Sequence, residues 1–248
     1  MNPLIVIQAR MSSKRLPGKV LMETGGGTLI DRIINSAQKS KLSKKIYIAT
    51  SRDKSDDHLV NYLKNKNVEV YRGSLDNVFS RFYEIALNEK KYFDSIVRLT
   101  GDCPLLDSNL IDNTLNFHYK NNCDYTSTGL SKTFPLGQSV EVVSLKKFLQ
   151  IDKKLLDKED LEHVTRYIWK RTKIYKCGSP SYENHRHPNA NELRLTVDEE
   201  EDLDLVKKIV KGLGYSDQKD VSIDEMVDYL YSNPKIIEIN KHVKQITT

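Results

Sequence analysis

The chain has 248 residues, of which 29% are charged and 38% hydrophobic, and its formal net charge is +5. This composition is ordinary for a globular protein, and the length suffices to bury a core without disulfides or structural metals. A disulfide framework is excluded, because Cys103, Cys123 and Cys177 are odd in number and widely spaced. No apolar stretch reaches membrane-spanning length, and no signal-peptide pattern precedes the first apolar run. We therefore expect a cytoplasmic protein without a membrane partner.

The basic residues do not form a nucleic-acid-binding signature. Acidic and basic side chains are mixed along the chain, without an arginine-rich tail, a zinc finger or an RNA-binding aromatic motif. We expect no nucleic-acid partner and assign local clusters of positive charge to a small anionic ligand.

The first half of the chain alternates apolar, strand-like runs with amphipathic, helix-like segments. Strands are predicted at residues 4–9, 45–50, 68–71 and 95–100, and helices at residues 28–39, 56–65, 77–88 and 108–119. Thr28 and Asp31 form a capping pair at the start of the first helix, just after three glycines. The alternation predicts parallel strands joined by crossover helices, and hence an α/β fold with an open, doubly wound sheet.

The order of the elements changes in the second half. Strands are predicted at residues 124–128, 139–144, 173–177 and 193–197, and helices at residues 145–150, 159–170, 199–213 and 223–232. No linker, repeat or low-complexity segment interrupts the chain. We interpret residues 1–248 as a single domain, with an insertion at about residues 125–190 that covers one end of the sheet.

Ligands bind outside the carboxyl ends of the strands in open α/β sheets, which directs attention to three loops. The first loop follows the strand at residues 4–9 and is rich in cations and hydroxyl groups. Its cations are Arg10, Lys14, Arg15 and Lys19, and Ser12 and Ser13 lie between them. A nucleoside triphosphate carries roughly four negative charges and needs several charge-assisted hydrogen bonds. A solvated basic loop is the alternative, but the position at the end of the first strand favours phosphate binding.

The second loop follows the strand at residues 95–100 and reads Gly101-Asp102-Cys103-Pro104. Gly101 allows a close backbone approach. The carboxylate of Asp102 suits Mg²⁺, which prefers a few carboxylates together with phosphate oxygens. A turn-forming aspartate before a proline explains the same residues equally well.

The third loop begins at Asp198, after the strand at residues 193–197. Asp198 is a good N-cap for the helix that follows, and three glutamates suit the first turn of that helix. Local sequence favours this capping role. Paired with Asp102, however, Asp198 would supply the second carboxylate of a metal site.

Motifs of one family run along nearly the whole chain. They read I-Q-A-R-M-S-S-K-R-L-P-G-K at residues 7–19, G-S-L-D-N-V-F-S-R-F-Y at residues 73–83 and R-L-T-G-D-C-P-L-L-D at residues 98–107. E-H-V-T follows at residues 162–165, L-R-L-T-V-D-E-E-E-D-L at residues 193–203 and N-P-K-I-I-E-I-N at residues 233–240. These motifs resemble the cytidylyltransferases that make CMP-3-deoxy-octulosonate and CMP-sialic acids. They most resemble the relatives of those enzymes that are called spore coat polysaccharide biosynthesis protein F.

The resemblance implies a GT-A-like Rossmann variant, Mg²⁺ as the cofactor and CTP as the nucleotide. It implies transfer of CMP from CTP to an acidic sugar or a related small anion, with release of pyrophosphate, for surface glycan or polysaccharide biosynthesis. Cytidylyl transfer to a phosphate or phosphonate metabolite is one alternative. A glycosyltransferase of the same GT-A type is another, although the cationic loop favours a triphosphate over a diphospho-sugar.

The resemblance also implies roles for individual residues. The expected nucleotide-binding residues are Ala9, Arg10, Ser12, Arg15, Lys19 and Arg81, with Ala9 and Arg81 near the pyrimidine. The expected catalytic residues are Lys19, Asp102 and Asp198. The two aspartates are the expected ligands of Mg²⁺. Local sequence leaves open a turn role for Asp102 and a capping role for Asp198, and the resemblance favours the metal role for both.

The acceptor site departs from the family pattern. Related proteins often show P-x-G-L-D-V-E-V where this chain reads P-L-G-Q-S-V-E-V at residues 135–142, so the identity of the acceptor is open. Gln138, Glu141, His163 and Arg186 are the candidate acceptor residues. A structural histidine is the alternative for His163, and a solvated loop is the alternative for Arg186.

The inserted region also bears on assembly. Its apolar strands and the aromatic residues Tyr167 and Trp169 suggest a surface that needs a partner. Related cytidylyltransferases commonly dimerise through a comparable insertion, and we therefore expect a homodimer.

Overall fold

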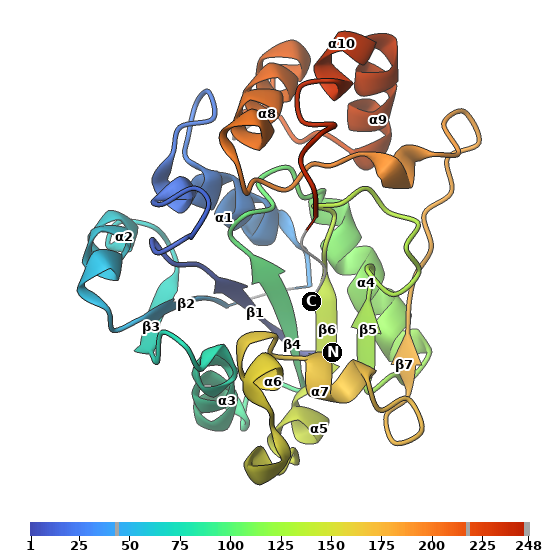
Figure 1. Ribbon diagram of the computed structural model, residues 1–248. Coiled ribbons are helices and arrows are strands. Elements are labelled where there is room, and N and C mark those ends of the chain that lie inside the picture. The colour runs from blue at the N-terminus through green and yellow to red at the C-terminus, as the bar shows by residue number, and fades with distance from the viewer. Residues whose placement is uncertain (43–44, 217–218, 246–248) are drawn as a thin grey trace.

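One mixed sheet forms the centre of the molecule (Figure 1). The computed structural model describes residues 1–42, 45–216 and 219–245. Within these ranges seven strands lie in the order β3-β2-β1-β4-β6-β5-β7. The strands are β1 (Pro3–Gln8), β2 (Ile46–Ser51), β3 (Glu69–Gly73), β4 (Ser95–Thr100), β5 (Tyr125–Ser127), β6 (Glu141–Ser144) and β7 (Cys177–Gly178). The first four are mutually parallel, β6 is antiparallel to both of its neighbours, and β7 is parallel to β5.

Helices cover both faces of this sheet. They are α1 (Leu29–Lys39), α2 (Asp57–Leu63), α3 (Val78–Glu89), α4 (Ser108–Lys120), α5 (Leu145–Leu149), α6 (Lys158–Glu162), α7 (Arg166–Trp169), α8 (Glu200–Leu213), α9 (Ile223–Ser232) and α10 (Pro234–Ile237). Alternate side chains of a strand point to opposite faces. Leu4 and Val6 of β1 accordingly belong to an apolar cluster with α3, α5 and α7, whereas Ile5 and Ile7 belong to a cluster with α1, α4, α8 and α9. The predicted α/β fold with a doubly wound, mostly parallel sheet is confirmed.

The start of α1 follows the sequence prediction. The Thr28 hydroxyl accepts a hydrogen bond from Asp31 N at 3.3 Å, and the Asp31 carboxylate accepts one from Thr28 N at 3.0 Å. Both halves of the predicted capping box are therefore formed. The three preceding glycines all have positive φ angles, a conformation that glycine adopts without a steric penalty. No helix in the described part of the chain is long and apolar enough to cross a membrane.

The segment expected as an insertion, residues 125–190, extends the central sheet. Its strands β5, β6 and β7 continue the sheet beyond β4, and Phe148 of α5 packs on Phe79 of α3 with ring centroids 5.0 Å apart. The prediction of a single helix at residues 159–170 is wrong. His163 has φ −102° and ψ 50°, outside the helical region, so the chain breaks there into α6 and α7.

The strand predicted at residues 193–197 is also wrong. Only an isolated bridge forms there, between Leu136 and Arg194, with Leu195 N donating to Leu136 O at 2.6 Å. Gly137 lies against the same segment, since a Cβ added to it would come within 2.6 Å of the carbonyl carbon of Leu195. The segment is thus positioned by one tightly packed loop and not by the main sheet.

Gly137→Ala is expected to destabilise the protein through this contact. Gly137 has φ 104°, and an added Cβ would also meet the backbone of Leu195. Gly214→Ala is the matched control, because Gly214 has φ 60° but nothing within 4 Å of an added Cβ. Both changes add strain on the order of 1 kcal/mol. Only Gly137→Ala adds a clash, which costs about 1–3 kcal/mol more. Urea unfolding measures the difference, and equal losses would contradict the close packing.

Candidate functional site

The loop after β1 turns back so that its last residue is buried. Ser13 N and Gly18 N both donate to Met11 O, at 2.9 and 2.8 Å. Gly18 has φ 74°, which a residue with a side chain rarely adopts. The 3₁₀ helix η1 (Lys19–Leu21) begins directly after this glycine. The turn therefore directs Lys19 inward, where only 8% of the residue is exposed.

Asp56, a fully buried carboxylate, anchors the same loop to the sheet. Its Oδ1 accepts a hydrogen bond from Met11 N at 2.6 Å, and its Oδ2 accepts one from Ser51 N at 3.0 Å. Ser51 is the last residue of β2. The carboxylate thus fixes the cationic loop relative to the carboxyl end of the neighbouring strand.

Lys19 brings together the two carboxylates that the sequence assigns to a metal. Its Nζ lies 3.3 Å from Asp102 Oδ2 and 3.0 Å from Asp198 Oδ1, and it donates to Val197 O at 2.7 Å. Val197 N in turn donates to Asp102 O at 2.8 Å. Asp102 follows β4, so the cluster lies at the carboxyl end of the parallel strands, where ligands bind in open α/β folds.

Two arginines hold the outer side of Asp198. Its Oδ2 lies 2.9 Å from a guanidinium nitrogen of Arg15 and 2.8 Å from one of Arg194. Arg194 also pairs with Asp202 at 2.8 Å, and Asp202 Oδ2 accepts from Asp198 N at 2.9 Å. The N-cap of α8 is Glu199. The capping role considered for Asp198 is therefore wrong, and its carboxylate belongs to the charge cluster.

The charges of this cluster stabilise one another. Burial lowers the pKa of Lys19, but the neighbouring carboxylates of Asp102 and Asp198 raise it more, so that it lies above its ordinary value of 10.5. Burial raises the pKa of Asp198, but Lys19 and Arg15 lower it more, so that it lies below its ordinary value of 3.8. The ammonium and the carboxylate are consequently both ionised at neutral pH.

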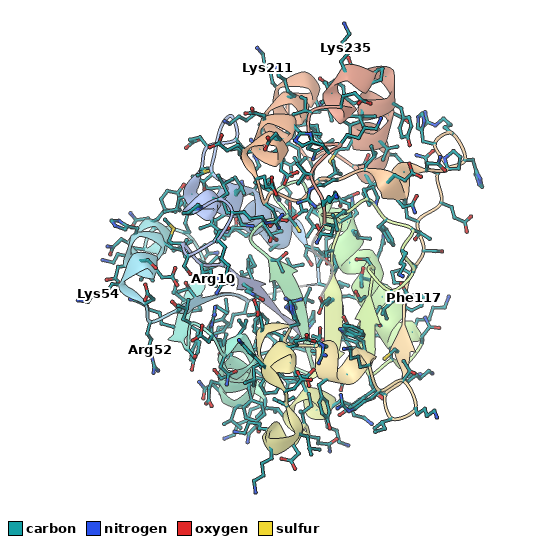
Figure 2. All side chains as sticks on the ribbon, viewed as in Figure 1. Arg10, Arg52, Lys54, Phe117, Lys211 and Lys235 are labelled. Carbon is teal, nitrogen blue, oxygen red and sulfur yellow. The ribbon has the colours of Figure 1, made fainter. Side chains whose placement is uncertain are left out.

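The remaining polar groups of the loop are available to a ligand. Arg10 and Lys14 make no ion pair or side-chain hydrogen bond with any residue that the structure describes. Figure 2 shows Arg10 where β1 ends. Ser12 Oγ is buried without a hydrogen-bond partner in the described chain, which is costly for a hydroxyl unless a ligand or water completes it. These groups match the oxygens of a phosphate chain.

Comparison with known proteins assigns the family. A family model described as Cytidylyltransferase matches residues 4–236. The chain belongs to the cytidylyltransferase family. An uncharacterized protein of Methanocaldococcus jannaschii is 36% identical over 242 residues, which are 97% of this chain and 95% of that protein. The spore coat polysaccharide biosynthesis protein SpsF of Bacillus subtilis is 34% identical over 237 residues, covering 93% and 95% of the two chains.

A solved structure supports the same assignment. A cytidylyltransferase from Leptospira borgpetersenii superposes on the whole of this chain and is itself wholly covered, with a TM-score of 0.85 and 28% identity. The resemblance and the fold that the sequence predicts are thereby confirmed. The protein is an enzyme, a nucleotidyltransferase that uses CTP.

The role predicted for Arg81 of this cytidylyltransferase needs a correction. Its side chain is fully buried and donates to Ser74 O at 2.7 Å, Leu75 O at 2.8 Å and Ala49 O at 3.2 Å. Burial lowers the pKa of its guanidinium to about 10. This fully buried side chain shapes the loop before α3 and presents no surface to a ligand, so its predicted place near the pyrimidine would be structural. Ala9 lies beside it, since Ala9 N donates to the same Ala49 oxygen at 3.4 Å.

Gln138 is also placed differently from its prediction as an acceptor residue. Only 1% of it is exposed. Its Nε2 donates to Leu105 O at 2.7 Å, and its Oε1 accepts from Asp107 N at 3.0 Å. With its amide satisfied on both sides, Gln138 joins the loop after β4 to the inserted region. Its role is structural.

Glu141 lies in a polar chain that crosses three strands. Its Oε1 accepts from Arg98 at 2.5 Å, and its Oε2 accepts from the hydroxyl of Thr165 at 2.5 Å. Arg98 also donates to Gln8 Oε1 at 3.0 Å, while its Nε is buried without a partner among the described residues. His163, partly exposed at the end of α6, lies two residues before Thr165. Glu141 and His163 stay predicted acceptor residues.

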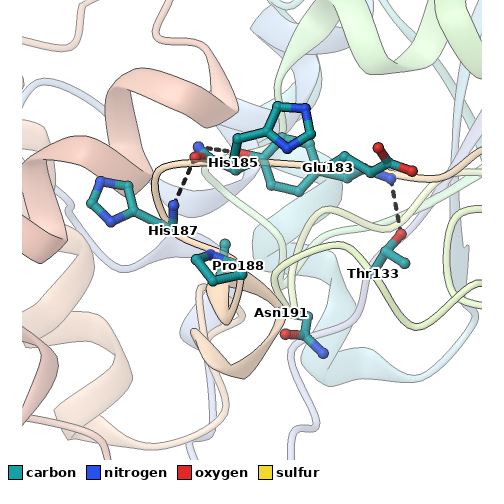
Figure 3. A pocket seen from close by; sticks show the side chains of 9 residues that line it. Thr133, Glu183, His185, His187, Pro188 and Asn191 are labelled. Carbon is teal, nitrogen blue, oxygen red and sulfur yellow. Dashed lines mark hydrogen bonds between the residues drawn. The ribbon is translucent and has the colours of Figure 1, made fainter.

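The loop that contains Arg186 borders a pocket of about 380 Å³ (Figure 3). The pocket is lined by Thr133, Tyr182, Glu183, Asn184, His185, His187, Pro188, Ala190 and Asn191. This lining contains no described lysine or arginine. Arg186 is outside it and pairs with Asp228 at 2.7 Å, as does His187 at 3.1 Å. The geometry therefore gives no support to Arg186 as a receptor for an anionic acceptor.

The carboxylate pair fits a magnesium ion. Asp102 and Asp198 each direct an oxygen at one point, the Nζ of Lys19. Among the described residues no cluster of three or more histidine, cysteine or acidic side chains forms a metal site. Mg²⁺ is commonly held by one or two carboxylates together with substrate phosphates and water, and two carboxylates beside the cationic loop match that ligand set.

Sequence reasoning missed Asp56, Arg194 and Asp202. Asp56 stands at the start of α2, where an acidic residue is expected for capping alone. In the last acidic motif, Arg194 stands in the alternating run that was predicted as a strand. Asp202 stands in the first turn of the helix that follows. Their eight-residue spacing contains no signal that the chain between them bends back into a charge pair. Only the packing of the segment before α8 brings them together.

Asp202→Asn is expected to destabilise the protein above about pH 4 by on the order of 3 kcal/mol, because Arg194 loses a buried ionic partner. Burial raises the pKa of Asp202, but the bonds from Arg194, Asp198 N and Asn240 lower it more, so that it lies below 3.8. A lowered pKa gives stability that is present above the unfolded value and is lost as pH falls through the folded value.

The gap between the two unfolding curves should therefore be constant well above pH 4 and narrow as the pH falls below about 4. Asp204→Asn is the control, since this neighbour on α8 has a 64% exposed side chain. Urea unfolding from pH 3 to pH 7 measures the effect. A constant gap between wild type and Asp202→Asn at every pH would contradict the charge-pair assignment.

Proposed function

We propose that this cytidylyltransferase transfers CMP from CTP to an acidic sugar or a related small anion, in the biosynthesis of a surface glycan or polysaccharide. Two observations support the acceptor class. The motifs resemble the enzymes that make CMP-activated acidic sugars, and a relative of matching length is named for spore coat polysaccharide biosynthesis.

The observation that carries the proposal is the convergence of Asp102 and Asp198 on Lys19 Nζ, at 3.3 and 3.0 Å. This point lies beside the cationic loop and at the carboxyl end of the parallel strands. A triphosphate bound by that loop would bring its phosphates to the two carboxylates. We assign these carboxylates as the ligands of Mg²⁺.

The reaction forms a bond between an acceptor oxygen and the α-phosphorus of CTP and breaks the bond from that phosphorus to pyrophosphate. Such transfer depends on positioning and charge neutralisation more than on covalent catalysis. Arg10, Arg15 and Lys19 would neutralise the triphosphate and then the departing pyrophosphate. Mg²⁺ held by Asp102 and Asp198 would supply Lewis-acid polarisation of the phosphate and the acceptor oxygen.

The acceptor contacts are assigned to the polar chain that contains Glu141. Arg98 beside it is a cation with a buried, unpartnered Nε in the described chain, which suits a carboxylate or hydroxyl of a sugar. His163 lies at the end of α6, close in sequence to Thr165, which bonds to Glu141 at 2.5 Å. Acceptor identity would then depend on contacts from these residues and not on Gln138.

Pyrophosphate release tests the proposed function directly. Wild-type enzyme is incubated with each nucleoside triphosphate, Mg²⁺ and a panel of acidic sugars and phosphorylated metabolites. We expect release from CTP with an acidic sugar, and a loss of about a hundred-fold or more in Asp198→Asn across a magnesium titration. Glu201→Gln is the control, because Glu201 lies in the same acidic turn with a 44% exposed side chain.

Three outcomes would overturn parts of this proposal. Pyrophosphate release from CTP only with phosphorylated metabolites would show that the acceptor is a phosphate compound and not an acidic sugar. Consumption of a nucleotide-sugar without pyrophosphate would indicate a glycosyltransferase. Normal turnover of Asp198→Asn at ordinary magnesium would remove Asp198 from the metal site.

We also propose that the enzyme is a homodimer that associates through the region of residues 125–190. Three large apolar residues of this region are exposed: Leu130 at 40%, Leu155 at 60% and Ile174 at 69%. A partner that covers these side chains would remove apolar surface from water. Light scattering at micromolar concentration is expected to give twice the mass of 28.6 kDa. A monomeric mass would refute the proposal.

A further inference from the structure

The ammonium of Lys19 has its full set of partners inside the protein. An ammonium has three donors, and Nζ lies within 3.3 Å of Asp102 Oδ2, Asp198 Oδ1 and Val197 O. Only 8% of the residue is exposed. Lys19 is therefore held in the cluster by ionic contacts that solvent barely screens.

The same point is the one that a metal ion bound by both carboxylates would take. Magnesium–oxygen distances are about 2.0–2.1 Å, so an ion held by Asp102 Oδ2 and Asp198 Oδ1 would come close to Nζ, which lies 3.3 and 3.0 Å from the same two oxygens. Two cations at such a separation repel strongly in a partly buried site. The Lys19 ammonium and a divalent ion thus exclude each other.

A triphosphate provides the alternative partner for Lys19. The residue follows Gly18 at the base of the cationic loop, so the phosphate oxygens that Arg10 and Ser12 are suited to bind would lie along the same loop. Transfer of the ammonium from carboxylate to phosphate keeps it paired, and it leaves Asp102 Oδ2 and Asp198 Oδ1 without the cation that they share.

We propose that Lys19 occupies the metal position of this site and gives it up only to a triphosphate, so that Mg²⁺ enters with CTP and not before it. The inference rests on the proposed metal site. Because linkage is reciprocal, Mg²⁺ and CTP each strengthen the binding of the other. While no nucleotide is bound, the Lys19 ammonium neutralises the two carboxylates.

Arg15 provides a comparison within the same cluster. It also pairs with Asp198, at 2.9 Å, but through the outer oxygen Oδ2, and its other partner is Glu199 at 3.2 Å. It makes no ion pair or hydrogen bond with Asp102 in the described chain. Arg15 therefore neutralises charge without occupying the point between the two carboxylates.

Binding of Mn²⁺, measured by the electron paramagnetic resonance signal of the free ion, tests the inference without turnover. In the absence of nucleotide, Lys19→Met should bind Mn²⁺ at least about tenfold more tightly than wild type. Lys19→Arg, which keeps a cation, should bind as weakly as wild type. Arg15→Gln should gain much less than Lys19→Met. Addition of CTP should raise the Mn²⁺ affinity of wild type, and thermal unfolding verifies that each variant is folded.

The outcomes separate this inference from the proposed metal site. Wild type that binds Mn²⁺ alone as tightly as folded Lys19→Met would overturn the inference and leave the metal site intact. An equal gain in Arg15→Gln would also overturn it, because net charge alone would then explain the effect. If Asp102→Asn leaves Mn²⁺ binding in the presence of CTP unchanged, the metal site itself is wrong.

Discussion

The ionic contacts of Lys19 are the constraint on which the rest of the site depends. One buried ammonium holds Asp102, which follows β4, next to Asp198, which precedes α8. Like charges so close would repel in the absence of a cation. Gly18 turns Lys19 inward and Asp56 fixes the loop that carries it. The cluster therefore joins the amino-terminal strand, the middle of the sheet and the carboxy-terminal helices.

The parts of the fold that sequence predicts are those with strong periodicity. Strands β1 and β4 are buried along most of their length, and helices α1 and α3 bury one face, so both kinds of element show a clear sequence pattern. The strand prediction at residues 193–197 was wrong because the alternation of apolar and polar residues there is also typical of a strand. Its backbone instead bonds to Leu136 and, through Val197 N, to Asp102 O. These partners lie far away in sequence, and no local pattern reveals them.

The same limit applies to the site. The family motifs drew attention to Lys19, Asp102 and Asp198, and the structure brings these three side chains together. Their roles toward the phosphates and the metal stay predictions. Arg81 and Gln138 were assigned to ligands, yet the structure uses their donors on backbone carbonyls. Burial with hydrogen bonds to the backbone is a tertiary property, and polar residue type alone does not distinguish it from ligand binding. Arg194 and Asp202 were missed for the converse reason, since they act on Asp198 and not on a ligand.

In the proposed reaction Asp102 and Asp198 hold the divalent ion of a CTP complex. The most direct test is a crystal structure with CTP and Mn²⁺, in which anomalous scattering locates the metal independently of the protein model. We expect one anomalous peak in contact with an oxygen of each carboxylate and with a phosphate oxygen, and we expect Lys19 Nζ to be displaced onto the phosphates. Bound CTP with the manganese peak elsewhere, or with Lys19 still between the two carboxylates, would contradict it.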